Sequence, residues 1–330
     1  MTLRITSPDA AVAITPYLLG FTPTDSLVLM FSDPELPQRS LRVDLPDQID
    51  LRWLQGILAG VPHPPLRTVV VIVYADTVPF SFAQAVIDWV TSVFDPALEV
   101  LDSVIVHDEA MHSLMHAIQG GQPVPMSEIE NHPVVAECVA HGMSRLASRD
   151  ALHALLEFVD DEFSAAVTDL LDGGSPSASS YEQLRDMLER RAFEALLSRL
   201  DLTAFDVMIV GLACSDVFAR DPLITLLLNE HEGDREMLHA VRDRLGFCVA
   251  HLPDDLAGPT AATLALLSWS QGDGASALVA ADRAMAADPT NTLGPLVSDA
   301  LQHGLPPETW ANVTGDIPMN VLRGQIRHTA

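Results

Sequence analysis

The chain contains no lysine: its 18 basic residues are all arginine, against 45 acidic residues, and the formal net charge is -27. This absence excludes a Schiff-base enzyme, which needs an amine nucleophile, and a Walker-type phosphate loop, which needs Gly-Lys-Ser/Thr. The acid excess argues against a broad nucleic-acid-binding surface, because phosphate contacts depend on clustered basic side chains. It favours a basic protein partner, or self-repulsion that keeps the protein in solution.

Cysteine and long apolar stretches are also scarce. Cys138, Cys214 and Cys248 are too few and too scattered for a disulfide framework, which fits a reducing compartment. The longest apolar run, Val69–Ala75, is far shorter than the ~20 residues that cross a bilayer. No signal peptide is visible, so we expect a soluble, cytoplasmic protein without membrane contact. Because 48% of the residues are hydrophobic, wholesale disorder is excluded.

The first third of the chain alternates between strand and helix patterns. Strand patterns occupy Ser26–Phe31, Ser40–Leu45, Thr68–Tyr74 and Ser103–Val106. Helical apolar spacing occupies Ile49–Gly60 and Phe82–Phe94. This βαβ rhythm predicts an α/β domain over residues 1–125, with a mostly parallel sheet and helices on both faces.

From about Ser127 only helical patterns remain, which predicts an all-α domain over residues 126–316. A hinge is expected at 173–180, where two glycines, a proline and four serines offer nothing to pack. Near its end, Ala261–Asn291 is typical of a tetratricopeptide-like hairpin, with small residues on both helices and a glycine-rich turn. One such hairpin cannot bury its own face, so we expect it to stack on the preceding helices.

The segment 317–330 differs from the rest of the chain because it contains Arg323 and Arg327 and no acidic residue. We expect this basic C-terminal tail to fold back onto the acidic body or to dock on another chain. Arg323 and Arg327 are therefore the candidate partner-binding residues.

The opening of the chain carries a distinctive motif, and later features follow it in a set order. The segments concerned are Ile5–Pro8, Pro16–Val28 (Pro-Tyr-Leu-Leu-Gly-Phe-Thr-Pro-Thr-Asp-Ser-Leu-Val), Arg42–Pro46, Thr68–Asp76, Ser148–Leu152 and the helical hairpin near the end. The sequence resembles an actinobacterial family of domains of unknown function, over most of its length. The resemblance implies an actinobacterial or actinophage origin and implies no activity. Many relatives carry a Trp- and Cys-rich segment where this chain has Met111–Pro125, which lacks cysteine.

Polar residues follow the predicted strands, where ligands bind in open α/β sheets. They are Ser32-Asp33, Asp76-Thr77 and His107-Asp108-Glu109. Because carboxylates that converge with a histidine can hold a divalent cation such as Mg²⁺, Asp76, His107 and Asp108 are the candidate catalytic residues. The alternative is that each aspartate only caps the turn that follows its strand.

Two further patterns point to zinc. His112 and His116 would share one face of a helix, although the glutamate of a His-Glu-x-x-His motif is missing between them. The sequence Cys-Val-Ala-His also occurs twice, and together the two copies would supply the ligands Cys138, His141, Cys248 and His251. The alternative is that the cysteines are small buried apolar side chains and the histidines are exposed.

No cofactor is predicted, because the sequence has no Gly-x-Ser-x-Gly elbow and no glycine-rich phosphate loop. Zinc or magnesium would bind only at the candidate residues given above.

The leading hypothesis is a cytoplasmic interaction or regulatory protein whose acidic surface and helical groove bind a basic protein partner. One alternative is a metal-dependent hydrolase or nucleotide-binding enzyme with its site at the strand ends. Another is an acidic mimic of nucleic acid.

Overall fold

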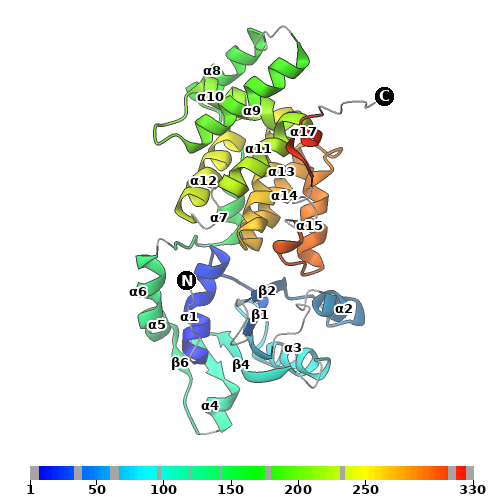
Figure 1. Cartoon of the computed structure of the whole chain (residues 1–330). Coiled ribbons are helices and arrows are strands. Elements are labelled where there is room, and N and C mark those ends of the chain that lie inside the picture. Colours follow the sequence, from blue (N-terminus) through cyan, green and yellow to red (C-terminus); the bar gives the residue numbers. More distant parts are fainter. Residues whose placement is uncertain are drawn as a thin grey trace, which may run out of the picture. The chain divides into compact units, whose positions relative to one another are not determined.

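The computed structural model describes residues 7–32, 39–59, 67–94, 98–118, 120–141, 143–174, 180–230, 235–310 and 317–324. The chain divides into two compact units, which are described separately. The N-terminal unit comprises Met1–Arg149 with Gln302–Leu305, and the helical unit comprises Asp150–Leu301 with Pro306–Ala330. Among the described residues, every strand of the sheet belongs to the N-terminal unit (Figure 1).

In the part of the chain that the structure describes, six strands form one sheet, in the order β2-β1-β3-β4-β5-β6. Their bounds are Ser26–Ser32 (β1), Arg39–Asp44 (β2), Thr68–Tyr74 (β3), Glu99–His107 (β4), Ala110–Ser113 (β5) and Val124–Pro125 (β6). β1 is antiparallel to both β2 and β3, and Leu29 of β1 lies opposite Val71 of β3. β3 and β4 are parallel, whereas β4–β5 and β5–β6 are antiparallel.

The sheet is therefore mixed, and the expectation of a mostly parallel sheet is wrong. Among its described strands, β3 and β4, joined through helix α3 (Phe80–Ser92), make the one parallel pair. The strand and helix patterns indicate the order of elements along the chain but carry no information about strand direction. β1 and β2 instead form consecutive antiparallel strands, and Asp108-Glu109 turns β4 back into β5.

Helices cover both faces of this sheet, as predicted. On one face lies α1 (Pro8–Leu19), where the Thr15 hydroxyl lies 3.4 Å from Met30 Sδ. The opposite face packs against α2 (Leu51–Ala59) and α3. Its fully or almost fully buried side chains are Leu27, Leu29, Phe31, Ile57, Val69, Val71, Val73, Ala83, Val86, Ile87, Val90 and Ile105. Since side chains alternate along a strand, this double cover explains why β3 is apolar on both of its faces from Val69 onward.

Strands end at Pro125, close to where the sequence pattern changes, but the compact N-terminal unit continues to Arg149. The short helices α4 (Leu114–Ile118), α5 (Met126–Ile129) and α6 (Pro133–Ala140) follow the strands. α5 and α6 contact α1, so they belong to the unit that contains the sheet.

The helical unit is built from helices around one apolar core. Their bounds are Arg149–Ala154 (α7), Glu162–Asp172 (α8), Tyr181–Leu197 (α9), Ala204–Ser215 (α10), Val217–Glu230 (α11), Arg235–His251 (α12), Asp254–Ser270 (α13), Gly274–Ala287 (α14), Leu293–Gln302 (α15) and Met319–Leu322 (α17). α11 and α13 each contain a proline, Pro222 and Pro259, five residues after the helix begins. Each proline removes one backbone hydrogen bond of its helix, because its nitrogen has no N–H to donate to the carbonyl four residues earlier.

α13 and α14 form the helical hairpin that the sequence predicts near 261–291. Its small residues Ala265, Ala277, Ala281 and Ala284 are completely buried, which allows the two helices to approach closely. The side chain of Asp273 begins α14 by accepting a hydrogen bond from Ser276 N. α13 also packs against α10 and α12, so the hairpin lies on preceding helices as expected.

Most of the predicted hinge at 173–180 lies outside the described residues. In the part of the chain that the structure describes, no helix combines the length and the apolar character that crossing a membrane requires.

The close packing of the hairpin can be tested with Ala281→Leu. Three additional side-chain carbons have no room at a fully buried position, so we expect a loss of about 1–3 kcal/mol in the free energy of unfolding. Ala286→Leu is the matched control, because Ala286 is exposed on the same helix. Urea denaturation of both variants gives the comparison, and equal stabilities would contradict the packing.

Candidate functional site

The ends of three neighbouring strands meet at one edge of the sheet in the N-terminal unit. The carboxyl ends of β3 and β4 coincide because these strands are parallel, and the start of β1 joins them because β1 is antiparallel to β3. Asp76 and His107, both predicted as site residues, therefore lie at the same edge as Asp25, which the sequence reasoning did not select.

Two aspartates, Asp25 and Asp76, join the start of β1 to the loop after β3 through hydrogen bonds. The Asp25 carboxylate accepts hydrogen bonds from Asp76 N and Thr77 N, both at 2.9 Å, and from the Thr77 hydroxyl at 2.6 Å. In return, Asp25 N donates to Asp76 Oδ2 at 3.4 Å. Asp25 has φ +38°, a backbone conformation that aspartate tolerates better than most residues. The opening motif thus supplies a side chain that joins the start of β1 to the loop after β3.

The two carboxylates have opposite pKa shifts. Burial acts to raise the pKa of Asp25, but the hydrogen bonds from Thr77 and from the backbone of Asp76 and Val78 outweigh it and lower the pKa. Burial raises the pKa of Asp76, and the neighbouring charge of Asp25 adds to the rise. Asp76 is therefore the member of the pair for which the negative charge is unfavourable in the folded protein.

His107 is oriented by the backbone of the neighbouring strand end. Its Nδ1 lies 2.7 Å from Ala75 O, so Nδ1 donates, and its Nε2 lies 3.4 Å from Asp108 Oδ2. The rings of His107 and His112 both contact the ring of Phe80 edge-on, with centroids 5.9 and 5.0 Å apart. This edge combines imidazole, carboxylate and aromatic groups, but their contacts are with each other and with the backbone.

Asp108 is a turn residue. Asp108 and Glu109 have φ +50° and +56°, and they form the two-residue loop between the paired residues His107 and Ala110. Positive φ at both central positions is the geometry of the type I′ turn that joins tight hairpins. The alternative interpretation, in which aspartate serves the turn after a strand, accounts for Asp108.

The helical arrangement expected for His112 and His116 is wrong. His112 lies on β5 and His116 on α4, because Ser113 separates a strand from a helix. Ser113 Oγ donates to the buried carboxylate of Asp102 and accepts from His116 N, so this pair of residues starts α4. The two imidazoles therefore do not share a helical face.

A metal ion needs three or more ligands, and among the described residues no group of three His, Cys, Asp or Glu side chains is placed to supply them. Asp33, which the sequence also placed at a strand end, lies outside the described residues. At Asp76, His107 and Asp108, the described side chains serve loop and turn contacts instead, and the enzyme hypothesis stays a prediction.

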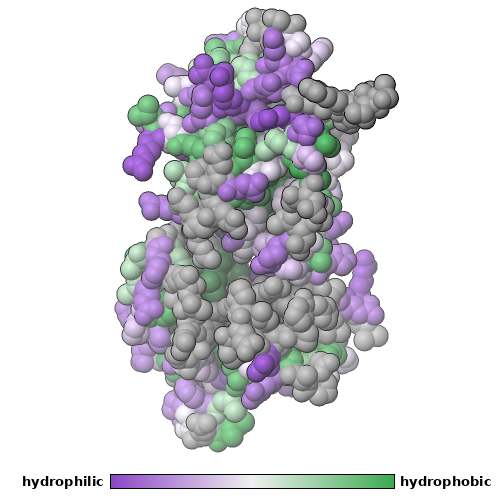
Figure 2. Space-filling model, in the orientation of Figure 1, coloured by the Kyte–Doolittle hydropathy of each residue, from purple (hydrophilic) through white to green (hydrophobic). Residues whose placement is uncertain are grey.

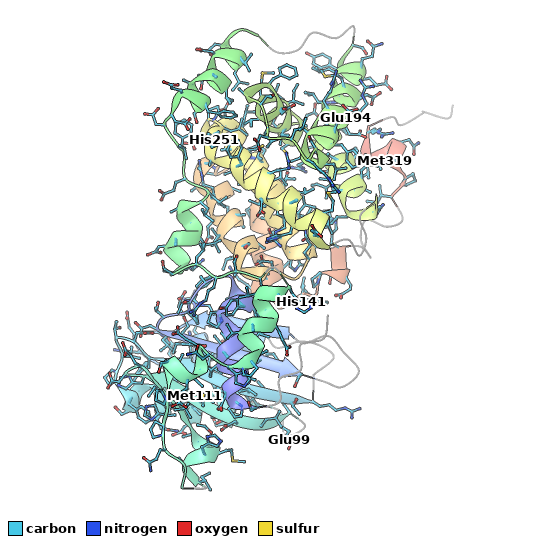
Figure 3. All side chains as sticks on the ribbon, turned by 90° about the vertical axis from the view of Figure 1, so that its left-hand side faces the viewer. Glu99, Met111, His141, Glu194, His251 and Met319 are labelled. Carbon is cyan, nitrogen blue, oxygen red and sulfur yellow. The ribbon has the colours of Figure 1, made fainter. Side chains whose placement is uncertain are left out.

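The two Cys-x-x-His motifs lie in different units, Cys138 and His141 in the N-terminal unit and Cys248 and His251 in the helical unit (Figure 3). Each histidine has its Nδ1 within hydrogen-bond distance of the backbone carbonyl four residues earlier, at 2.7 and 2.9 Å. Both cysteines are completely buried, and burial raises the pKa of each thiol. Buried thiols of this kind behave as small apolar side chains, and a zinc site from all four residues stays a prediction.

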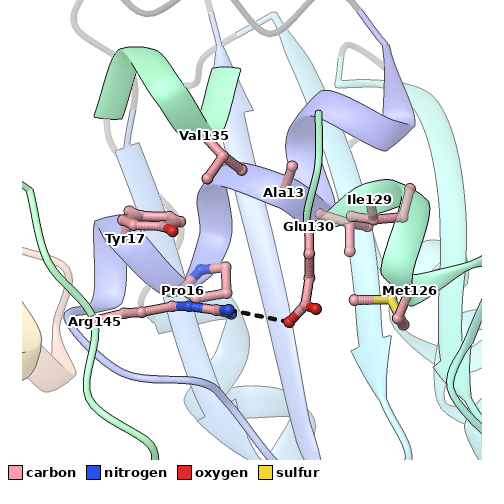
Figure 4. A pocket seen from close by; sticks show the side chains of 9 residues that line it. Ala13, Pro16, Tyr17, Met126, Ile129, Glu130, Val135 and Arg145 are labelled. Carbon is pink, nitrogen blue, oxygen red and sulfur yellow. Dashed lines mark hydrogen bonds and ion pairs between the residues drawn. The ribbon is translucent and has the colours of Figure 1, made fainter. Parts of the chain in front are cut away.

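A small pocket of the N-terminal unit lies beside the opening motif (Figure 4). Arg145 there donates to Glu130 Oε1 at 3.0 Å, and its guanidinium lies 5.6 Å from the centre of the Tyr17 ring. The cavity volume is about 20 Å³, roughly the space of one water molecule. The pocket is too small for a substrate.

Other residues of the opening motif join segments of the N-terminal unit. Gly20 ends α1 with φ +74°, and its carbonyl accepts a hydrogen bond from Leu146 N at 2.8 Å. Thr22 N in turn donates to Leu146 O at 3.0 Å. Ser26 Oγ accepts from Arg42, whose Nη2 lies 2.7 Å away. The motif therefore has a structural role in this unit.

The helical unit contains a larger concave site, which we call the α9 hollow, with a volume of about 310 Å³. It is lined by Asp186, Glu189, Arg190, Phe193, Leu226 and Arg323. Arg323, a predicted partner-binding residue, donates through Nε and Nη2 to the two carboxylate oxygens of Glu189, at 2.9 and 2.6 Å. The described part of the tail thus folds back onto the acidic body, whereas Arg327 lies outside the described residues. Sequence patterns gave no signal for Glu189, which is 134 positions away.

The fastening of the sheet edge can be tested with Asp25→Ala. The variant leaves Asp76 N, Thr77 N and the Thr77 hydroxyl without their acceptor, so we expect it to lower the free energy of unfolding by about 1–3 kcal/mol. Asp25→Asn is the control, since an amide oxygen can still accept and asparagine tolerates positive φ, and it should cost less. Chemical denaturation measures both, and an Asp25→Ala variant as stable as wild type would refute this role.

Asp76→Asn should stabilise the protein at neutral pH by a small amount, under about 1 kcal/mol. The pKa of Asp76 is raised by folding, so the folded state carries a penalty above that pKa and none below the unfolded value near 4. The gain should therefore shrink as pH falls from 7 toward 4. Melting temperatures across this range test it, with Asp47→Asn, at an exposed position, as the control. A gain that grows on acidification would have the wrong sign.

Comparison with known proteins gives a family and no closer relative. No curated protein and no solved structure matches the chain. One family matches residues 8–308, a span that includes the sheet, the strand-end edge and the α13–α14 hairpin. The chain therefore belongs to the family described as Domain of unknown function (DUF4192).

Proposed function

We propose that the protein is a cytoplasmic interaction or regulatory protein whose helical unit binds a basic protein partner. The observation that carries this proposal is the α9 hollow, where the buried carboxylate of Glu189 already binds an arginine from a basic segment of the same chain. The net charge of -27 would steer a positively charged partner toward such a surface.

The surface around the hollow has the composition that such a partner needs. Asp186 and Glu194 are exposed on α9, and hydrophilic side chains gather over α8 and α9 (Figure 2). Phe193 and Leu226 add apolar lining within the hollow. Carboxylates beside apolar side chains favour a partner that presents both a basic and an apolar group.

Two other features are compatible with this role. The α13–α14 hairpin, which we interpret as tetratricopeptide-like, gives the unit a stacked helical framework of the kind that binds peptides in grooves. Cys138, Cys214 and Cys248 are free and buried, which suits a reducing cytoplasm.

The electrostatic part of the proposal is tested by salt. The immobilised full chain is exposed to a soluble extract at about 0.05 M salt, and we expect the captured proteins to be basic and to elute by about 0.5 M, where charges more than ~4 Å apart are screened. The double variant Asp186→Asn/Glu194→Gln should capture several-fold less. Retention of the same proteins through about 0.5 M salt would contradict the proposal.

A further inference from the structure

We propose that Glu189, at the wall of the α9 hollow, and the neighbouring Phe218 form a recognition site for an arginine-glycine turn of a protein partner, and that the chain's own segment 317–324 binds there as a detachable pseudo-ligand. The inference rests on the proposed function and deepens it, because it names the feature of the basic partner that the surface recognises.

The bound arginine is held with the geometry of a specific site. Glu189 is 4% exposed, and its two oxygens each accept one hydrogen bond from the same guanidinium of Arg323. A two-pronged contact of this kind fixes the direction of the arginine as well as its charge, and lysine cannot reproduce it. Asp186 adds a second negative charge near Arg323.

The residue after the arginine is also specified. Gly324 has φ +69°, and a Cβ atom on it would lie 2.9 Å from Cδ1 of Phe218. Both the backbone conformation and the contact therefore require glycine at this position. The Phe218 ring is in turn held by Arg185, whose guanidinium lies 4.4 Å from the ring centre and donates to Asp216 at 2.8 Å. An aromatic platform and a buried carboxylate thus bind two consecutive residues.

The segment that occupies the hollow is weakly attached. Its helix α17 has four residues, far fewer than a helix needs to be stable by itself, and it packs on α11 (Figures 1 and 3). None of the described residues 317–324 is buried, and Val321 is 44% exposed. The lightly held end of the chain is therefore exchangeable with an external ligand.

Charge complementarity identifies the occupant as a partner segment that resembles the tail. Apart from Arg323, the charged side chains that line the hollow are the acidic Asp186 and Glu189 and the basic Arg190, while residues 317–330 contain two arginines and no acid. The site therefore suits a basic turn in which apolar residues precede an arginine and a glycine follows it, as in Val-Leu-Arg-Gly of the tail.

The test uses the full-length chain and a fluorescent peptide with the sequence of residues 317–330, with binding followed by anisotropy. Arg323→Ala in the protein vacates the hollow, so we expect the peptide to bind this variant at least tenfold more tightly than wild type, in which the tail competes. A peptide with alanine in place of its first arginine, and a scrambled peptide of equal charge, should not bind. Arg199→Ala, at an exposed arginine of the same unit, should behave as wild type.

Gly324→Val provides a second way to vacate the hollow. It changes neither Arg323 nor Glu189, but the valine side chain would collide with the Phe218 ring and displace the segment. Peptide binding should therefore again increase at least tenfold. Adding Glu189→Gln to either variant should abolish that gain. This variant keeps the proposal testable if Arg323→Ala impairs folding, which circular dichroism would reveal.

Several outcomes would overturn the proposal. They are equal peptide binding by wild type and both vacated variants, no binding by any of them, and binding of the scrambled peptide as tight as that of the native one. A wild-type dimer in sedimentation that Arg323→Ala dissociates would assign the hollow to the tail of a second copy instead. If salt-sensitive partners bind wild type and Arg323→Ala equally, this site fails while the proposed function stands. If the peptide binds as expected but the captured proteins stay bound in about 0.5 M salt, the recognition site stands and the electrostatic part of the proposed function fails.

Discussion

The pairing of β3 with an antiparallel β1 on one side and a parallel β4 on the other is the constraint on which the N-terminal unit depends. It buries β3 between two helical layers, and it decides which loops share an edge of the sheet. Asp25, Asp76 and His107 meet only because of these directions. Their hydrogen bonds then close the edge, and the positive φ at Asp25 is maintained by three donors around its carboxylate.

Sequence patterns predicted where helices and strands lie along the chain better than they predicted how these elements pair in space. The strand at Thr68–Tyr74, the helical cover on both faces and the α13–α14 hairpin follow from apolar periodicity, which reports burial directly. Strand direction does not alter that periodicity, so the mixed sheet could not be predicted from it. His112 and His116 show the same limit at short range, since a spacing of four residues has meaning only if the helix continues between them.

The candidate sites differ in what the sequence could reveal. Asp76 and His107 could be predicted because they lie at strand ends. Their hydrogen-bond partners could not, because Asp76 pairs with Asp25 and His107 with Ala75, each of which is far from its partner in the chain. The basic tail was visible from composition alone, whereas its acceptor Glu189 was not. Glu189 lies on a helix with many other charged residues, and only the folded structure shows that it is the buried one. In a chain without lysine, such ion pairs depend on the planar arginine group, which favours directional contacts.

The buried thiols give each unit an internal reporter. Cys138 lies in the N-terminal unit, and Cys214 and Cys248 lie in the core of the helical unit. A thiol reacts as the thiolate, and burial both blocks access and raises the pKa, so modification by an alkylating reagent requires local opening. The alkylation rates of the three cysteines, resolved by mass spectrometry, would therefore report the local opening of the two units separately, with no engineered label in the chain.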